Sequence, residues 1–310
     1  MAENIKVNEV APEQSSPQGM KEKDINNVSK KQTVMKIIVQ VALYAFLVIM
    51  AVIVLFPFYW MLISSVKTIS EYNLASPTLW PRQFQWSNYK TAFTSDLKLG
   101  RLFLNTVLVG VVSTLLSLVV TVLSAYAFAR LNFKGKDAMF GALLATMMIP
   151  GELFTITNYI TVSAFGWLNT FTVLIVPFLV SVFYIYLLRQ NFMQIPNELY
   201  LAAKVDGTSD LKYLWRVMIP LAAPTLISIT ILKMMGSWNS YIWPRLVAND
   251  LAHRLITVGL RGAAFQDSTG QVDFPAQMAA VALVTLPLLL VFLFFRKYIM
   301  RGVSRSGIKG

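Results

Sequence analysis

The sequence contains no cysteine and a single histidine, His253. The lack of cysteine excludes disulfides, thiolate metal sites and cysteine nucleophiles. With one histidine, we expect neither a histidine-based metal site nor a serine–histidine–aspartate triad. Charged residues are also scarce, at 14% of the 310 residues, against about 25% in a typical soluble domain. The sequence therefore excludes an ordinary soluble globule, and it predicts no metal site and no catalytic residue.

Apolar residues make up most of the sequence. They make up 56% of the chain, and the mean hydropathy is +0.58. A membrane-spanning helix needs about 20 apolar residues. Six segments of suitable length predict six transmembrane helices and an all-α membrane protein: about 34–66, 102–129, 138–156, 171–188, 213–235 and 277–295. Six prolines in or beside these segments are interpreted as kinks: Pro57, Pro150, Pro177, Pro220, Pro224 and Pro287.

The N-terminal segment differs in composition. Residues 1–32 are polar and irregular, which predicts a disordered cytoplasmic tail before a transmembrane domain at 33–310. The tail is not interpreted as a signal peptide, because the apolar stretch begins late and is too long.

The basic residues indicate the orientation in the membrane. With the N-terminus inside, the inner segments 1–36, 130–137, 189–216 and 296–310 hold 18 Lys and Arg residues. The outer segments 67–101, 157–169 and 236–275 hold 8. The positive-inside rule then predicts that both termini are cytoplasmic. This asymmetry explains the net charge of +12 without a nucleic-acid partner.

No nucleotide site is found. Residues 302–309 resemble a phosphate-binding loop only superficially, because the lysine comes one place late and no strand precedes it. We therefore expect no ATP hydrolysis by this chain. Glu152 and Lys233 are the notable charges near membrane depth, and such residues are candidates for a solute path. Alternatively, both lie near the outer ends of their helices and extend into water.

The inner segment at about 196–210 is the most informative. Pro196 is placed to start a short helix, and Ala202 and Ala203 form a small-residue surface that permits close approach. Asp206 and Gly207 end that helix. Three residues can cap the next helix: Thr208, Ser209 and Asp210. A plain connecting helix is the structural alternative.

The spacing of this segment, with Ala-Ala, then Gly207, then Ile219-Pro220, resembles the cytoplasmic signature of ABC importer permeases. Further segments resemble carbohydrate-type permeases: Ser124–Arg130, Phe133–Gly135, Met148–Glu152, Asn158-Tyr159, Leu168–Thr170, Arg189-Gln190 and Gly236–Asn239 with Trp243-Pro244. The resemblance covers about residues 34–310. It is greatest to the smaller, maltose-transporter type subunit, which pairs with a second, different permease.

The resemblance implies a fold and partners. The fold is that of type I ABC importer permeases, called MetI-like, with six transmembrane helices. The implied partners are the second permease, two ATPase subunits and an extracytoplasmic solute-binding protein. Mg-ATP would be bound by the ATPase subunits, and this chain would hold no cofactor. The resemblance also implies a multi-pass protein of a bacterial plasma membrane.

The resemblance further implies that the inner helix is a coupling helix docked in a groove of the ATPase. Its candidate residues are Glu198, Leu201, Ala202, Ala203, Asp206 and Gly207. Permeases of this family usually have glutamate directly before the Ala-Ala pair, where this chain has Leu201. Glu198, three residues earlier, lies on the same helix face and can supply a carboxylate. Otherwise the ATPase groove is more apolar here.

Candidate residues of the translocation path are Glu152, Asn158, Lys233, Trp238 and Asn239. For Trp238 an interfacial position is the default interpretation, and stacking on a sugar is the alternative. The predicted function is import of a di- or oligosaccharide, with a permease for glycerol phosphate or another polyol as the alternative. A stand-alone secondary transporter is less favoured, because neither an inverted repeat nor midplane ion-binding charges are found.

Overall fold

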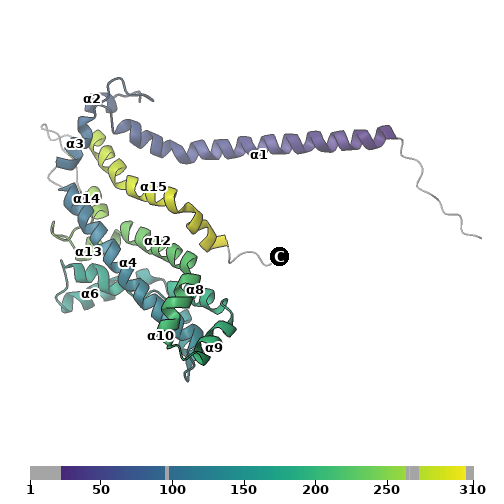
Figure 1. Ribbon diagram of the computed structural model, residues 1–310. Helices are drawn as coiled ribbons and strands as arrows, with labels where there is room; N and C mark the ends of the chain where they lie inside the picture. Colours follow the sequence, from purple (N-terminus) through teal and green to yellow (C-terminus); the bar gives the residue numbers. More distant parts are fainter. Residues whose placement is uncertain (1–21, 95–97, 263–264, 266–271, 305–310) are drawn as a thin grey trace, which may run out of the picture. The chain divides into compact units, whose positions relative to one another are not determined.

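The computed structural model describes residues 22–94, 98–262, 265 and 272–304, and the regular elements of this part of the chain are all helices (Figure 1). The predicted all-α membrane architecture is therefore confirmed. The chain divides into two compact units, one ending at Tyr59 and one beginning at Trp60.

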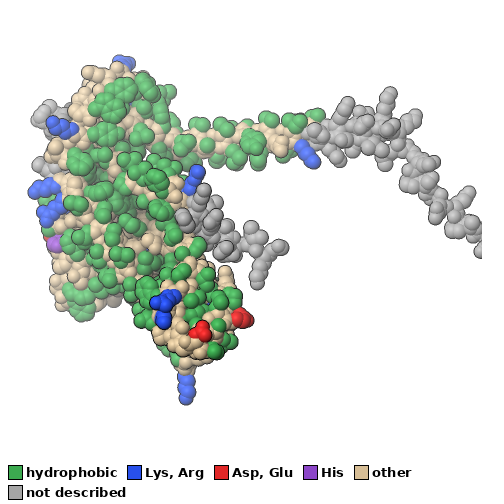
Figure 2. All heavy atoms as spheres, in the orientation of Figure 1, with side chains coloured by type: hydrophobic (Ala, Val, Ile, Leu, Met, Phe, Trp, Pro, Cys, Tyr) green, Lys and Arg blue, Asp and Glu red, His purple; other side chains and the backbone are tan. Residues whose placement is uncertain are grey.

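The first unit consists of most of α1 (Glu22–Ser64), a helix of 43 residues. Residues 34–64 form an apolar span, and Figure 2 shows apolar side chains along it. A helix that is apolar all round suits a lipid surrounding. The helix begins at Glu22, so residues 22–32 of the predicted disordered tail are helical, since lysine, glutamate and glutamine favour continuing a helix. Residues 1–21 lie outside the described residues.

The second unit is built around α4 (Leu99–Arg130), which contacts α8 (Val182–Met193) and α12 (Ala223–Trp238). In turn, α12 contacts α15 (Phe274–Ser304). The buried side of α4 carries small hydroxyl residues, which let neighbouring helices approach closely: Ser113, Thr114, Ser117 and Thr121.

Three predicted helices are interrupted in the structure. The first joins α5 (Lys136–Thr146) to η1 (Gly151–Phe154) and α6 (Thr155–Ala164) with a bend of 83°. The second joins α7 (Phe171–Ile175) and η2 (Val176–Phe178) to α8 with a bend of 44°. The third joins α10 (Asp210–Tyr213), η3 (Leu214–Met218) and α11 (Ile219–Leu221) to α12 with a bend of 81°.

Prolines lie at all three breaks. Pro150, Pro177 and the pair Pro220 and Pro224 each remove a backbone donor, and their rings crowd the preceding turn. At these four prolines the predicted kinks are therefore breaks, and 138–156, 171–188 and 213–235 are not continuous helices. Pro57 and Pro287, by contrast, lie inside the continuous helices α1 and α15. Among the described residues, three helices are long and apolar enough to span a membrane, or up to six when each bent pair counts as one span.

The two ends of the second unit carry different short helices. At one end lie α2 (Ile69–Tyr72), α3 (Ser87–Thr94) and α14 (Ile256–Gly262), with α13 (Ile242–Val247) next to α7 (Figure 1). There Glu71 is buried and accepts hydrogen bonds from the Thr78 hydroxyl at 2.6 Å and the Arg82 N–H at 3.0 Å. The buried Lys67 donates to the Thr78 carbonyl oxygen. At the other end lie α9 (Asn197–Val205) and α10.

A hydrophobic core fills the space beside α9. It joins α4, α8 and the α10–α12 segment through residues that are almost fully buried: Tyr126, Leu188, Phe192, Tyr213, Leu214 and Met218. Tyr200 and Ala203 of α9 pack against this cluster. The core thus connects the short helix α9 to α4, the longest helix of the unit.

Candidate functional site

The first candidate site is the exposed helix α9 with its supports. Pro196 is the N-cap residue, and the helix runs from Asn197 to Val205. Gly207 ends it with φ +68°, where an L side chain is strained. The Gly207 N–H donates to the Lys204 carbonyl at 3.1 Å, and the Thr208 N–H donates to the Ala203 carbonyl at 2.8 Å. These two bonds make a Schellman motif, so the predicted helix and its glycine stop are confirmed.

One face of α9 is exposed and largely apolar. Leu201 is 55% exposed and Val205 is 89% exposed, and a separation of four residues places them on one face. Glu198 is also exposed, three residues before Leu201. Figure 2 shows that the Asp and Glu side chains visible on this side gather at the α9 end of the molecule. The face therefore offers an apolar centre with carboxylates beside it.

The two alanines of α9 lie differently. Ala203 is half-buried and packs against the hydrophobic core, whereas Ala202 is exposed. Between α9 and α10–η3 is a hollow of about 330 Å³, lined by Leu199, Ala202, Ala203, Asp206, Thr208, Lys212, Tyr213, Arg216 and Val217. The predicted coupling residues Ala202, Ala203 and Asp206 thus line one hollow.

Asp210 anchors the segment that follows α9. Its Oδ1 accepts a hydrogen bond from the Tyr126 hydroxyl at 3.0 Å and another from the Tyr200 hydroxyl at 2.9 Å. Its Oδ2 forms an ion pair with the Lys204 ammonium at 2.9 Å. Sequence reasoning offered Asp210 as a helix cap, but the structure uses it to join α4, α9 and α10. Ser209 occupies the N-cap position of α10 and makes no side-chain capping bond.

The two groups of α9 that donate to Asp210 have raised pKa values. The hydrogen bond to Asp210 raises the pKa of Lys204 above its ordinary value. Burial, and then the hydrogen bond to Asp210, raise the pKa of Tyr200. Both groups therefore keep their protons at neutral pH, and Asp210 keeps its donors.

Arg130 anchors the segment that precedes α9. Its guanidinium donates to the carbonyl oxygens of Phe192 at 3.0 Å and Ile195 at 2.5 Å, and to the Asn197 side-chain oxygen at 3.1 Å. Arg130 is the last residue of α4, one turn after Tyr126. Ser124–Arg130 carried a family resemblance in the sequence, but no anchoring role was predicted for it. A tyrosine and an arginine one turn apart at the end of an apolar segment were the signal that could have indicated the anchor.

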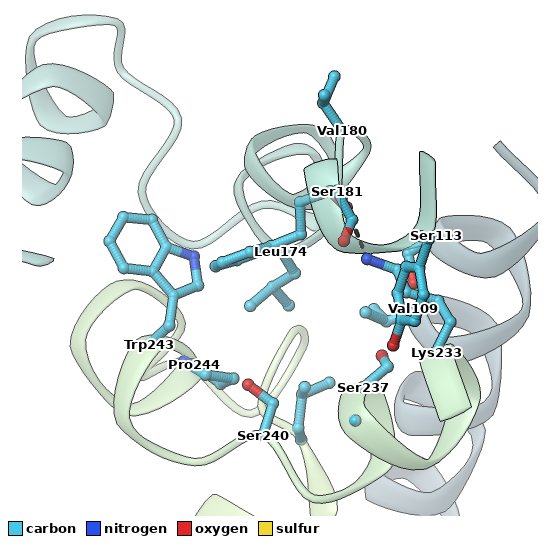
Figure 3. Close-up of a pocket in the computed structure, with 14 residues that line it drawn as sticks. Val109, Ser113, Leu174, Val180, Ser181, Lys233, Ser237, Ser240, Trp243 and Pro244 are labelled. Carbon is cyan, nitrogen blue, oxygen red and sulfur yellow. Dashed lines mark hydrogen bonds between the residues drawn. The ribbon is translucent and has the colours of Figure 1, made fainter. Parts of the chain in front are cut away.

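The second candidate site is a cavity of about 380 Å³ between α4, the α7–α8 break and α12 (Figure 3). Of the fourteen described residues that line it, Lys233 alone is charged. Its Nζ donates to the Phe178 carbonyl oxygen at 2.6 Å, at the break before α8. Four serines also line the cavity: Ser113, Ser181, Ser237 and Ser240. Lys233 therefore lies in a hollow, and its role in a solute path stays a prediction.

The other predicted path residues lie elsewhere. Glu152 in η1 and Asn158 on α6 are exposed, and neither lines this cavity. Trp238 is buried, and its ring packs edge-on against Phe103 with centroids 5.5 Å apart. Asn239 is exposed at the C-terminal end of α12. The structure thus brings only Lys233 of the five to the cavity, and Trp238 lies in the helix packing.

Comparisons with known proteins place the chain in a family. The family of binding-protein-dependent transport system inner membrane components matches residues 117–305. The diacetylchitobiose uptake system permease protein NgcG of Streptomyces coelicolor is 32% identical over 85% of this chain and 87% of its own. The arabinooligosaccharides transport system permease protein AraQ of Bacillus subtilis is 27% identical over 87% of this chain and 96% of its own.

The fold also matches a solved structure. A chain of a bacterial ABC transporter involved in the import of the acidic polysaccharide alginate superposes with a TM-score of 0.77 at 24% identity. The match covers 84% of this chain and 96% of that chain. The predicted ABC importer permease fold is therefore confirmed, and the chain, a multi-pass membrane permease, belongs to the family of binding-protein-dependent transport system inner membrane components.

Proposed function

We propose that this chain is the transmembrane permease subunit of an ATP-driven importer that moves a di- or oligosaccharide into the cytoplasm. Family membership and the names of NgcG and AraQ, both saccharide permeases, support the solute class. The observation that carries the coupling role is α9: an exposed short helix held at both ends by α4.

The proposed complex contains a second permease, two ATPase subunits and an extracytoplasmic binding protein. The ATPase subunits bind Mg-ATP and hydrolyse it, and this chain is not itself catalytic. The exposed Leu201 and Val205 suit burial in an ATPase groove, since apolar surface gains about 25 cal/mol per Å² when it is removed from water. The sequence left two alternatives open for Leu201: a substitute carboxylate from Glu198, or a more apolar ATPase groove. The exposed apolar side chains favour the more apolar groove.

The coupling step follows from the two anchors. When the ATPase subunits close, α9 moves with the groove that holds it. Arg130 and Asp210 tie α9 to the inner end of α4, so α4 moves as a rigid body. Ser113 of the Lys233 cavity lies thirteen residues from Tyr126 on α4, or about 20 Å along the helix. ATP binding would thereby change access to the cavity by favouring one of two states.

The orientation is part of the proposal. Both termini lie in the cytoplasm of a bacterial cell, because the inner segments carry 18 basic residues and the outer segments carry 8. This orientation also puts α9 on the side where ATP is available. A C-terminal reporter that is active only outside the cytoplasm should stay silent, and an active one would overturn both the orientation and the role of α9.

Reconstitution tests the whole proposal. The permease is co-expressed with the proposed partner permease, ATPase and binding protein, and uptake of saccharides into proteoliposomes is measured with and without ATP. We expect ATP-dependent uptake, and we expect no labelled ATP on the isolated chain. Leu201→Asp should abolish uptake and ATPase co-purification, whereas Phe93→Asp on the exposed side of α3 is the control. Uptake by this chain alone, without an ATPase, would instead indicate a secondary transporter, and uptake of glycerol phosphate alone would indicate the polyol alternative.

A further inference from the structure

The Lys233 cavity has one charge and no compensating carboxylate. Among the described residues, the ion pairs are Lys204 with Asp210 and His253 with Asp250, so Lys233 has no acidic partner there. Its one hydrogen bond goes to a neutral carbonyl, and an ammonium has three donors. A cation at membrane depth is costly unless it faces water or an opposite charge. The cavity therefore has positive charge available for a ligand.

The walls of the cavity differ in chemistry. Figure 3 shows Trp243 and Pro244 on one side of the open space and Lys233 with Ser181 and Ser237 on the other. Trp243 is held in place, because its indole N–H donates to the Val173 carbonyl at 3.0 Å. Serine hydroxyls can both donate and accept hydrogen bonds, as sugar hydroxyls do. One wall thus suits the apolar face of a sugar ring, and the other suits its hydroxyls and a negative group.

The volume also fits a small solute. About 380 Å³ lies within the range of small-molecule sites, which is about 300–1,000 Å³. Lys233 and Ser237 are four residues apart on α12 and so face the same space. A negatively charged oxygen of a ligand can then contact the Lys233 ammonium while the hydroxyls of the same ligand contact the serines.

We propose that this cavity is a solute subsite that selects an anionic saccharide, with Lys233 pairing to a carboxylate or phosphate group of the solute. The inference rests on the proposed importer function and narrows its solute class. It assigns recognition of charge to this chain, in addition to whatever the binding protein selects.

The absence of cysteine makes a direct test possible. A Ser237→Cys variant of the assembled transporter carries one thiol of this chain inside the cavity. A thiosulfonate reagent forms a mixed disulfide with that thiol and releases its sulfinate. Labelling rates are compared for sulfonatoethyl methanethiosulfonate, an anion, and trimethylammonioethyl methanethiosulfonate, a cation. Ser70→Cys, at an exposed position on α2, supplies the reference ratio of the two rates.

We expect the ratio of the anionic to the cationic labelling rate to be about tenfold higher at Ser237→Cys than at Ser70→Cys. This difference corresponds to about 1.4 kcal/mol of local attraction. Adding Lys233→Met should erase that preference, and adding Lys233→Arg should keep it. Lys90→Met, the same change at an exposed lysine of α3, is the matched control and should have no effect. An unchanged preference in Lys233→Met would overturn the inference.

Protection against labelling identifies the ligand chemistry. Digalacturonate should slow labelling at about tenfold lower concentration than galactobiose, its neutral counterpart, and Lys233→Met should abolish the difference. Stronger protection by glycerol 3-phosphate than by digalacturonate would identify phosphate as the preferred group. Equal protection by the acidic and neutral disaccharides, or loss of the partner permease from Lys233→Met preparations, would overturn the inference and leave the proposed importer function standing. Failure of ATP-dependent uptake in the reconstitution would overturn the importer function itself.

Discussion

Tyr126 and Arg130 lie one turn apart on α4 and hold opposite ends of α9. The Tyr126 hydroxyl donates to Asp210 after the helix, at 3.0 Å, and the Arg130 guanidinium donates to Ile195 before it, at 2.5 Å. Residues four apart on a helix face the same way, so one short stretch of α4 reaches both ends. A helix held at one end would pivot, whereas a helix held at both ends must move with α4.

The Tyr126 hydroxyl can be removed with little change in packing. Tyr126→Phe should weaken the attachment of the α10 end by about 1–2 kcal/mol, because a hydrogen bond to a carboxylate is lost. We expect saccharide uptake to fall several-fold while membrane level and ATPase co-purification stay normal. Tyr186→Phe, on an exposed tyrosine of α8, is the control. Equal uptake by the two variants would show that this bond does not transmit motion.

The two anchors should act as one unit. Arg130→Met leaves the carbonyls of Phe192 and Ile195 without their guanidinium donor. If Tyr126 and Arg130 hold one rigid helix, the free-energy effects of Arg130→Met and Tyr126→Phe on coupled ATPase activity should be non-additive, by about 0.5–3 kcal/mol. A double-mutant cycle measures this. Additivity within about 0.5 kcal/mol would mean that the two ends of α9 act independently.

Substitutions at Gly207 can distinguish a requirement for a positive φ from a requirement for space around the Cβ. A Cβ added there would meet no atom within 4 Å, but the residue has φ +68°. Gly207→Val should therefore cost about 1–2 kcal/mol by conformation alone and impair uptake. Gly207→Asn should be close to wild type, because asparagine tolerates the left-handed region. Equal loss in both variants would point to a contact with the ATPase instead.

The two alanines of α9 should respond differently to the same change. Ala202→Asp places a charge on the exposed side, so it should reduce ATPase co-purification while the permease stays folded. Ala203→Asp places the charge against the hydrophobic core, so it should lower thermal stability by a few kcal/mol, roughly the cost of an unpaired buried polar group. Thermal unfolding and co-purification are measured together for each variant. Normal stability of Ala203→Asp would contradict this packing.

Glu71 should make the segment at residues 65–94 sensitive to acid. Burial raises the pKa of this carboxyl, but hydrogen bonds from Thr78 and Arg82 outweigh burial and hold the pKa below the ordinary 4.5. A lowered pKa stabilises the folded segment fully above pH 4.5 and progressively less as the pH falls below it. Limited proteolysis within residues 65–94 should therefore accelerate below pH 4.5 in the wild type, and Glu71→Gln should be cleaved rapidly at neutral pH as well. A wild type equally resistant at both pH values would contradict this.

Much of the molecule was predictable from sequence because its signals are local. Long apolar runs predict membrane helices, since each span must satisfy its own backbone hydrogen bonds in lipid. The helix at 197–205 and its stop at Gly207 follow from residues within that segment. The spacing from Ala202 to Pro220 was enough to indicate the permease family.

The tertiary structure decided the relationships between distant segments. Whether a proline kinks or breaks a span depends on what neighbouring helices offer the freed carbonyls, as the Trp243 indole does for Val173, four residues before Pro177. The inward packing of Ala203 depends on the core that α4 and α8 build beside it. Asp210 meets Tyr126 across 84 residues of sequence, and Lys233 meets Phe178 across 55. Sequence alone determined the apolar helical segments and the family, because those depend on neighbours along the chain. The anchors and the charged cavity depend on helix packing, which only the folded chain contains.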